Sequence, residues 1–159
     1  MQSNFNMFHE TLVPDYELIV SRTDFDGKIT YVNDTFAEIS GYEPAELIGK
    51  NHSMIRHPDM PKSAFTDMWK TIKNGDIWKG YVKNLRKDGG YYWVYARVST
   101  VLKNGKPFEY KSSREPVSRE KIKEIQEYYD MLRAKEENKT RVVLYVNNDK
   151  LDMLKDLES

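Results

Sequence analysis

Three β-strand patterns joined by two tight-turn dipeptides form the centre of the chain, and they restrict its fold more than any other feature. The strands are expected at about Trp78–Arg86, Tyr91–Leu102 and Pro107–Glu115. Asp88-Gly89 and Asn104-Gly105 stand between them, and both dipeptides favour hairpin turns because their residues tolerate positive φ angles. The sequence therefore predicts an antiparallel meander of three strands.

Alternation along the first two of these strands predicts which side chains share a face of the sheet, because successive residues point to opposite sides. One face is expected to carry Trp78, Gly80, Val82 and Asn84 of the first strand and Tyr92, Val94, Ala96 and Val98 of the second. The opposite face has an aromatic row, Tyr91, Trp93 and Tyr95, which would be exposed if nothing covered it. The candidate covers are the N-terminal Phe5, Met7 and Phe8, a second subunit or a signalling partner.

Further strands and helices are expected before the meander. In chain order they are strands at Tyr16–Ser21 and Ile29–Val32, a short helix at Asp34–Ser40, and one helical turn at Pro44–Ile48. Asn33 or Asp34 is the expected N-cap of the short helix, and Gly41 is its expected end.

A longer amphipathic helix is expected to begin at Pro61 and to end at Gly75. Its apolar stripe consists of Ala64, Phe65, Met68, Trp69 and Ile72. The stripe predicts that Met68 and Trp69 belong to the core. Asp59 is expected to accept hydrogen bonds from the free amides at the start of this helix.

Together the elements predict an α+β architecture: a five-stranded antiparallel sheet, short helices over one face, and a pocket between helices and sheet. A charged helix is then expected at Ser118–Glu137, with Ile122, Ile125, Tyr129 and Leu132 at near-heptad spacing. That spacing permits packing against a second helix. Residues 140–149 resemble one more strand, and residues 150–159 resemble a helical turn.

Composition narrows the classes of function. The 25 basic and 25 acidic residues are balanced, which argues against nucleic-acid binding because that binding depends on phosphate neutralisation. Cysteine is absent, which excludes disulfides, thiolate metal sites and cysteine nucleophiles. No apolar run approaches the roughly 18 residues that cross a bilayer, and MQSNFNMFHE lacks the regions of a signal peptide. We therefore expect a soluble cytoplasmic domain without direct membrane insertion.

The segment NHSMIRHPDMP, Asn51–Pro61, contains two of the three histidines, an arginine and an aspartate. An arginine presents a two-pronged donor that suits phosphate, and a histidine can change protonation near neutral pH. Each residue also has an ordinary structural interpretation: a turn residue for His52, a surface group for Arg56 and a helix cap for Asp59. The cluster as a whole favours a binding loop.

Two stretches resemble a PAS domain over about residues 15–116. They are ITYVNDTFAEISGYEPAELIGK, Ile29–Lys50, and VKNLRKDGGYYWV, Val82–Val94. The segment Asn51–Pro61, followed by Ala64–Trp69, is similar more narrowly to the PAS domain of bacterial aerotaxis and energy-taxis receptors. The resemblance implies an N-terminal cap segment at 1–14, a PAS sensor domain at 15–116, a signalling helix at 117–137 and a tail at 138–159 whose role is open.

That family binds FAD non-covalently and signals its redox state to a chemotaxis transducer. The resemblance therefore implies a cytoplasmic sensor of redox or oxygen state and not an enzyme. The implied partner is a methyl-accepting transducer in the same or a separate chain, with membrane association through it, and a homodimer is a further option. The implied flavin site consists of Arg56, His57 and Asp59, with Asn33, Trp78, Asn84 and Tyr92 as additions. Trp78 would flank the flavin ring, and Asn84 would pair with its pyrimidine-like edge.

Two alternatives stay open. One is a haem-binding PAS oxygen sensor with His52 or His57 as axial ligand. The other is a cofactor-free PAS module that dimerises through the aromatic row or the C-terminal helix. Light-sensing flavin PAS domains carry their reactive cysteine in a stretch resembling GRNCRFLQ, and the matching stretch, Gly49–Arg56, places His52 at that position. A flavin here would act by electron transfer, because no thiol is present for adduct formation.

Overall fold

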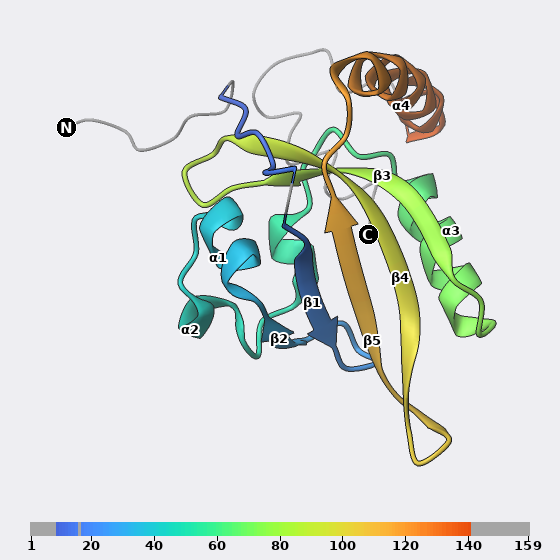
Figure 1. Ribbon diagram of the computed structural model, residues 1–159. Coiled ribbons are helices and arrows are strands. Elements are labelled where there is room, and N and C mark those ends of the chain that lie inside the picture. Colours follow the sequence, from blue (N-terminus) through green and yellow to red (C-terminus); the bar gives the residue numbers. More distant parts are fainter. Residues whose placement is uncertain (1–8, 16, 141–159) are drawn as a thin grey trace.

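A five-stranded antiparallel sheet in the order β2-β1-β5-β4-β3 forms the centre of the computed structural model, which describes residues 9–15 and 17–140 (Figure 1). The elements in chain order are β1 (Ile19–Thr23), β2 (Ile29–Val32), α1 (Asp34–Ser40), α2 (Pro44–Leu47), the 3₁₀ helix η1 (His52–Ile55), α3 (Lys62–Lys73), β3 (Trp78–Leu85), β4 (Tyr91–Lys103), β5 (Lys106–Glu115) and α4 (Arg119–Thr140). β5 pairs with β1 and so joins the first hairpin to the meander.

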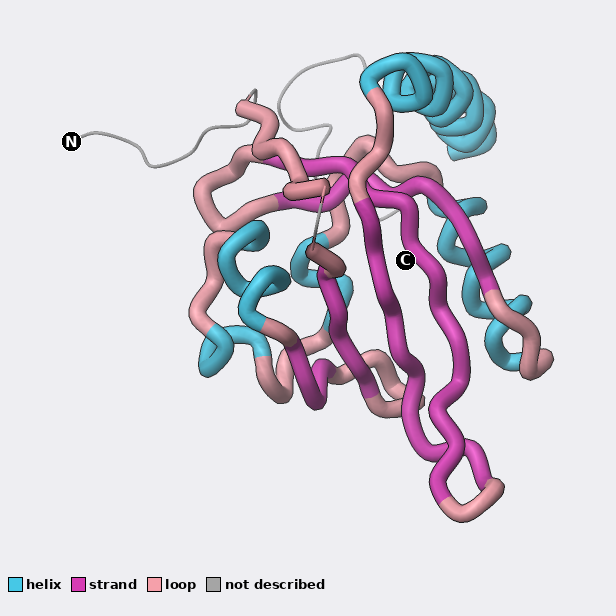
Figure 2. The backbone as a smooth tube through the Cα atoms, in the orientation of Figure 1, coloured by secondary structure: helices cyan, strands magenta, loops and turns pink. Residues whose placement is uncertain are grey.

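The predicted fold class and meander are confirmed. The β4–β5 turn has positive φ angles at both Asn104 (54°) and Gly105 (77°), as a two-residue type I′ hairpin requires. This hairpin extends beyond the rest of the sheet, as Figure 2 shows. The first strand begins at Ile19, where its ladder to β5 begins with the pair Ile19 and Arg114; Tyr16, where the sequence predicted its start, lies outside the described part of the chain.

Strand pairing confirms the predicted division of side chains between two faces. Val82 lies opposite Val94 and Asn84 opposite Tyr92, so the even-numbered residues of β3 and β4 share the inner face. Helices α1, α2 and α3 lie on this side of the sheet (Figure 1). Among the largest fully buried side chains are Ile19, Ile29, Phe36, Leu47, Ile55, Tyr92 and Val94.

Helix α1 begins where predicted, with Asn33 as its N-cap: Oδ1 of Asn33 accepts from the backbone N–H of Phe36 at 3.0 Å. The prediction that Asp59 caps α3 is wrong. The backbone N–H groups of Lys62 and Ser63 donate instead to the carboxylate of Glu136, at 2.9 and 3.2 Å. Glu136 belongs to α4, so this cap depends on tertiary structure.

Trp93, in the middle of the aromatic row on the outer face, is covered by α4. The ring of Tyr129 stacks on Trp93 with centroids 6.2 Å apart, and Trp93 is only 3% exposed. Ile122, Ile125 and Leu132 also pack against the core, so the apolar stripe of this helix contacts its own sheet. The proposed covering residues Phe5, Met7 and Phe8, and the strand and turn predicted within residues 141–159, lie outside the described residues.

The start of β4 also pairs with the N-terminal segment. The N–H of Tyr91 donates to the carbonyl oxygen of His9 at 2.9 Å, and the N–H of Thr11 donates to the carbonyl oxygen of Tyr91 at 2.8 Å. Arg119, at the start of α4, forms an ion pair with Glu10 at 2.7 Å. No helix within residues 9–15 and 17–140 is both long enough and apolar enough to cross a membrane.

Candidate functional site

A cavity lies between the inner face of the sheet, α3 and the loop that contains η1. Its volume is about 750 Å³ when the open solvent at its mouth is counted, and about 100 Å³ of it is space that the centre of a water molecule can occupy. The lining residues include Ser21, Trp78, Val82, Asn84, Ala96, Lys111 and Arg114 from the sheet, Phe65, Met68, Trp69 and Ile72 from α3, and His52 and Arg56 from the loop. Met68 and Trp69, which the sequence predicted as core, are half-buried and line the cavity.

Trp78 forms a fixed wall of the cavity. Its Nε1–H donates to Oδ2 of Asp67 on α3 at 2.9 Å, which fixes the orientation of the indole. Gly80 leaves room for the ring: a Cβ atom at Gly80 would lie 2.4 Å from Cη2 and Cζ2 of Trp78. The position of the flat indole of Trp78 therefore depends on its hydrogen bond to Asp67 in α3 and on the lack of a side chain at Gly80 in β3.

Arg114 enters the cavity from β5 as a buried cation. It is 4% exposed, and its Nη2 donates to Nε2 of His52 at 2.7 Å and to Oγ of Ser21 at 3.1 Å. Burial lowers the pKa of Arg114 to about 10, so the side chain is still charged at neutral pH. None of the ion pairs in the described part of the chain involves Arg114.

His52 is held in its neutral form. Because a guanidinium group only donates hydrogen bonds, Nε2 of His52 accepts the bond from Arg114. Burial and then the charge of Arg114 lower the pKa of His52 to about 3. The His52 ring also has an apolar neighbour, because it meets the ring of Phe36 in a T-shaped contact with centroids 5.8 Å apart.

Two buried donors in the cavity wall lack acceptors. Nδ2 of Asn84 and Nη1 of Arg114 have no hydrogen-bond partner of normal geometry among the described residues, although the amide of Asn84 is near enough to the Tyr92 hydroxyl to lower the pKa of that hydroxyl. A buried donor without a partner costs about 1–3 kcal/mol. Their position in the lining indicates that a ligand with hydrogen-bond acceptors would complete this site.

The charged residues that line the cavity are all basic. Arg56, Lys111 and Arg114 line it, and none of its lining residues in the described part of the chain is Asp or Glu. Arg56 is exposed at the mouth, whereas Arg114 is buried inside. Lys111 is exposed as well, and strand alternation places its side chain on the sheet face opposite to that of Ser112 and Arg114. Burial lowers the pKa of Arg56, and its guanidinium lies 3.9 Å from the ring centre of Phe65. The arrangement favours a ligand with negative charge.

Of the residues predicted for the cofactor site, Arg56, Trp78 and Asn84 line the cavity and Asn33 and Tyr92 do not. Besides capping α1, Asn33 accepts from the N–H of Val20 at 3.1 Å and donates to the carbonyl of Leu18 at 2.8 Å. Tyr92 is fully buried beside the cavity, and burial raises its pKa to about 12. Asn33 therefore joins β1 to the start of α1, and Tyr92 belongs to the inner face of the sheet.

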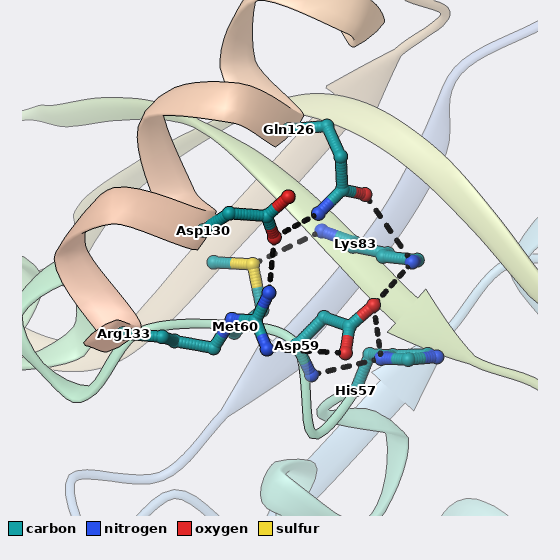
Figure 3. A network of polar contacts seen from close by, with 7 residues as sticks. All are labelled: His57, Asp59, Met60, Lys83, Gln126, Asp130 and Arg133. Carbon is teal, nitrogen blue, oxygen red and sulfur yellow. Dashed lines mark hydrogen bonds and ion pairs between the residues drawn. The ribbon is translucent and has the colours of Figure 1, made fainter. Parts of the chain in front are cut away.

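His57 and Asp59, also predicted for the cofactor site, lie outside the cavity lining in a polar network with α4 (Figure 3). Nδ1 of His57 accepts from the N–H of Asp59 at 3.0 Å, and Oδ2 of Asp59 accepts from Nζ of Lys83 at 2.6 Å. Burial and then the charge of Lys83 lower the pKa of His57. Burial alone would raise the pKa of Asp59, but Lys83, His57 and Arg133 lower it.

Sequence reasoning missed Arg114 and gave His52 only a structural or haem-ligand role. A signal for Arg114 was present, because it shares the face of Tyr110 and Ser112 by strand alternation. A charged residue on the buried face of a strand is rare unless something pairs with it.

The fold of this chain is shared with known proteins. A family model described as "PAS fold" matches residues 29–114. A solved structure from work on the mechanism of a light-oxygen-voltage domain with a flavin analogue superposes with a TM-score of 0.63, at 20% sequence identity, over 72% of this chain and 87% of that one. At this identity the likeness concerns the fold.

Several known proteins are similar in sequence. The aerotaxis receptor of Escherichia coli K12 is 45% identical over 124 residues, which are 78% of this chain and 24% of the receptor. The nitrogen fixation regulatory protein of Klebsiella pneumoniae is 32% identical over 92 residues, which are 58% of this chain and 19% of that protein. The chain thus spans a quarter or less of the length of these relatives. Because the family model covers more than half of the 159 residues, the chain belongs to the PAS-fold family.

Proposed function

We propose that this PAS domain is a sensor that binds FAD non-covalently in the cavity and relays its redox state to a chemotaxis transducer. The observation that carries the proposal is the pair of unpaired donors, Asn84 and Arg114, inside an apolar cavity whose lining includes the cations Arg56 and Arg114. A flavin ring offers carbonyl oxygens and ring nitrogens as acceptors, and its pyrophosphate is an anion. The similarity to an aerotaxis receptor supports the same conclusion.

Each part of the cavity suits one part of FAD. Trp78 and Val82 would flank the ring, and Asn84 and Arg114 would bind its polar edge. Arg56, at the mouth, would bind the pyrophosphate. His57 and Asp59 would act on the ligand only through Arg56 and the loop that they share with it, because they do not line the cavity.

Bound FAD would supply a redox centre that the side chains of this protein do not provide. Arg114 would stabilise negative charge on the ring through its own charge. The side-chain amide of Asn84 can present either a donor or an acceptor by rotation, so it would respond to a change of protonation at the ring. These residues would thereby convert a change of charge in the cavity into a change of hydrogen bonding in β3 and β5.

A transducer in the same or a separate chain, a cytoplasmic location and membrane association through that transducer belong to the same proposal. A haem sensor has less support, because Nε2 of His52 is occupied by Arg114 and Ser21 and His57 is not in the cavity lining. The open cavity with unpaired donors also favours a ligand-binding domain over a cofactor-free dimerisation module.

An absorption spectrum of the purified protein tests the cofactor. We expect flavin bands that bleach with dithionite, and release of FAD and not FMN on denaturation. A Soret band would show haem instead. A colourless protein that does not quench the fluorescence of added FAD would refute the proposal.

A matched pair of variants tests the site itself. Arg56→Gln removes a cation at the cavity mouth, whereas Arg97→Gln removes an exposed cation that is not among the lining residues. Because a charge-assisted hydrogen bond contributes about 1.5–3 kcal/mol, Arg56→Gln is expected to weaken FAD binding roughly tenfold or more. Arg97→Gln is expected to leave it unchanged. Equal effects of the two variants on FAD affinity would show that Arg56 does not bind FAD.

A further inference from the structure

The carboxylate of Asp59 connects the loop after η1 to β3 and α4 (Figure 3). Its Oδ2 accepts from Nζ of Lys83 at 2.6 Å, and its Oδ1 lies 3.6 Å from Nη1 of Arg133 on α4. Nζ of Lys83 donates further to Oε1 of Gln126 on α4 at 3.3 Å. Asp130 on α4 accepts from Gln126 and pairs with Arg133. We call His57, Asp59, Lys83, Gln126, Asp130 and Arg133, together with the separate contact of Glu136 with α3, the Asp59 network.

Glu136 adds a second link between α4 and the sensor domain. Its two carboxylate oxygens accept from the N–H groups of Lys62 and Ser63 in the first turn of α3. These amides have no partner within their own helix, and a negative charge at this end is favoured by the helix dipole. Release of Glu136 would leave the start of α3 without its cap.

Beneath this network, Ile122, Ile125 and Leu132 of α4 pack against the core but are only half-buried. Tyr129 is the only residue of α4 that is buried by more than nine-tenths in the described part of the chain, and its hydroxyl donates to the carbonyl of Tyr81 at 2.6 Å. A helix attached through few buried apolar side chains and many polar contacts belongs to the low-stability end of a fold, because water can replace the polar contacts. Docking of α4 is therefore sensitive to changes in the Asp59 network.

The network shares its backbone segments with the cavity. On β3, Val82 and Asn84 face the cavity, and Lys83 between them reaches Asp59. On the loop, Arg56 lines the cavity three residues before Asp59, and its backbone forms a β-bridge with Asn84. A displacement of Arg56 or Asn84 by a ligand would therefore shift Asp59 and Lys83 directly.

We propose that the Asp59 network couples the ligand state of the cavity to the docking of α4. Contacts made by Arg56 and Asn84 inside the cavity move the Asp59–Lys83 pair, and this shifts α4 between a docked and a released state. The inference rests on the proposed function, because FAD is the ligand used to test it. Coupling is reciprocal, so loosening the network from the α4 side must also change the affinity for FAD.

Hydrogen–deuterium exchange of the full chain, with and without FAD, measures the docking of α4. Glu136→Gln and Arg133→Gln weaken the network from α4, far along the chain from the cavity residues. Glu124→Gln removes the same charge from the same helix, but among the described residues its carboxylate pairs only with Lys121 one turn away, so it is the control. Binding of FAD is followed separately by quenching of its fluorescence.

We expect FAD to change the exchange of residues 119–136 in the wild type and in Glu124→Gln. We expect faster exchange in the two network variants, a smaller response to FAD, and a change of FAD affinity of about fivefold or more. FAD that binds without changing α4 exchange, or network variants that behave as the control does, would overturn the coupling and leave the FAD site standing. If FAD does not bind, the fluorescence assay shows it and both proposals fall.

Discussion

Nη2 of Arg114 donates to Nε2 of His52 across 2.7 Å, although the two residues are 62 positions apart in the chain. The contact places a permanently charged donor against a ring that must remain neutral to accept it. Both side chains line the same cavity. The pair therefore sets the electrostatics at the inner end of the site before any ligand enters.

His52 should make the protein less stable in mild acid. Its pKa is about 3 in the folded protein, against 6.5 for an unperturbed histidine, so between these values the unfolded chain binds a proton that the folded chain does not. The free energy of unfolding then falls as the pH falls from 6.5 towards 3, by at most about 1.4 kcal/mol per pH unit from this residue. His52→Asn, which keeps an acceptor for Arg114, should flatten the slope between pH 6.5 and 5 in urea unfolding.

The exposed His9 provides the control for that measurement. His9→Asn should leave the slope as in the wild type. A His52→Asn variant with the same slope as the wild type would show that water in the cavity solvates the ring and lets it protonate.

Removal of the charge of Arg114 should affect ligand binding far more than stability. Arg114→Met deletes a buried cation that has no acidic partner, so the unfolding free energy of the FAD-free protein should change by less than about 1 kcal/mol or rise. FAD affinity should fall roughly 10- to 100-fold, because a hydrogen bond from a charged group is lost. Urea unfolding and fluorescence titration measure the two effects. Severe destabilisation with unchanged affinity would assign Arg114 a purely structural role.

Gly80→Ala should displace Trp78. The added methyl group would lie 2.4 Å from the indole ring, and the ring cannot retreat without losing its hydrogen bond to Asp67. We expect a cost of about 1–3 kcal/mol, as for other overpacked cores, together with weaker FAD binding. In the double variant Gly80→Ala/Trp78→Leu, the alanine should cost much less than it does beside Trp78. A cost independent of residue 78 would point to the backbone of β3 instead.

Tyr129 should contribute to the docking of α4 through its ring more than through its hydroxyl. Tyr129→Phe removes only the hydrogen bond to the carbonyl of Tyr81 and should cost about 1 kcal/mol. Tyr129→Ala also removes the stacking on Trp93 and should cost about 3–5 kcal/mol. Urea unfolding of both variants gives the comparison. Costs near zero for both would mean that α4 is not docked in solution.

The sequence was sufficient for the sheet and for much of the cavity wall. Two turn dipeptides and the alternation of β3 and β4 placed Trp78, Val82 and Asn84 on one face, because the side-chain period of a strand is fixed at two residues. The α3 stripe was predicted for the same reason, by the helical period. Its assignment to the core was incomplete, since Met68 and Trp69 also line the cavity and periodicity does not distinguish a core from a cavity wall.

Contacts between distant segments were decided only by the tertiary structure. Asp59 looked like a cap for α3 because it stands just before that helix, yet Glu136, more than 70 residues later, accepts those hydrogen bonds. Arg114 and His52 belong to different elements, and no local pattern specifies that β5 brings one against the other. Local periodicity determines which way a side chain faces, whereas its partner depends on how separate elements pack. In this protein, that packing pairs Arg114 with His52 inside the cavity and Asp59 with Lys83 and Arg133 outside it.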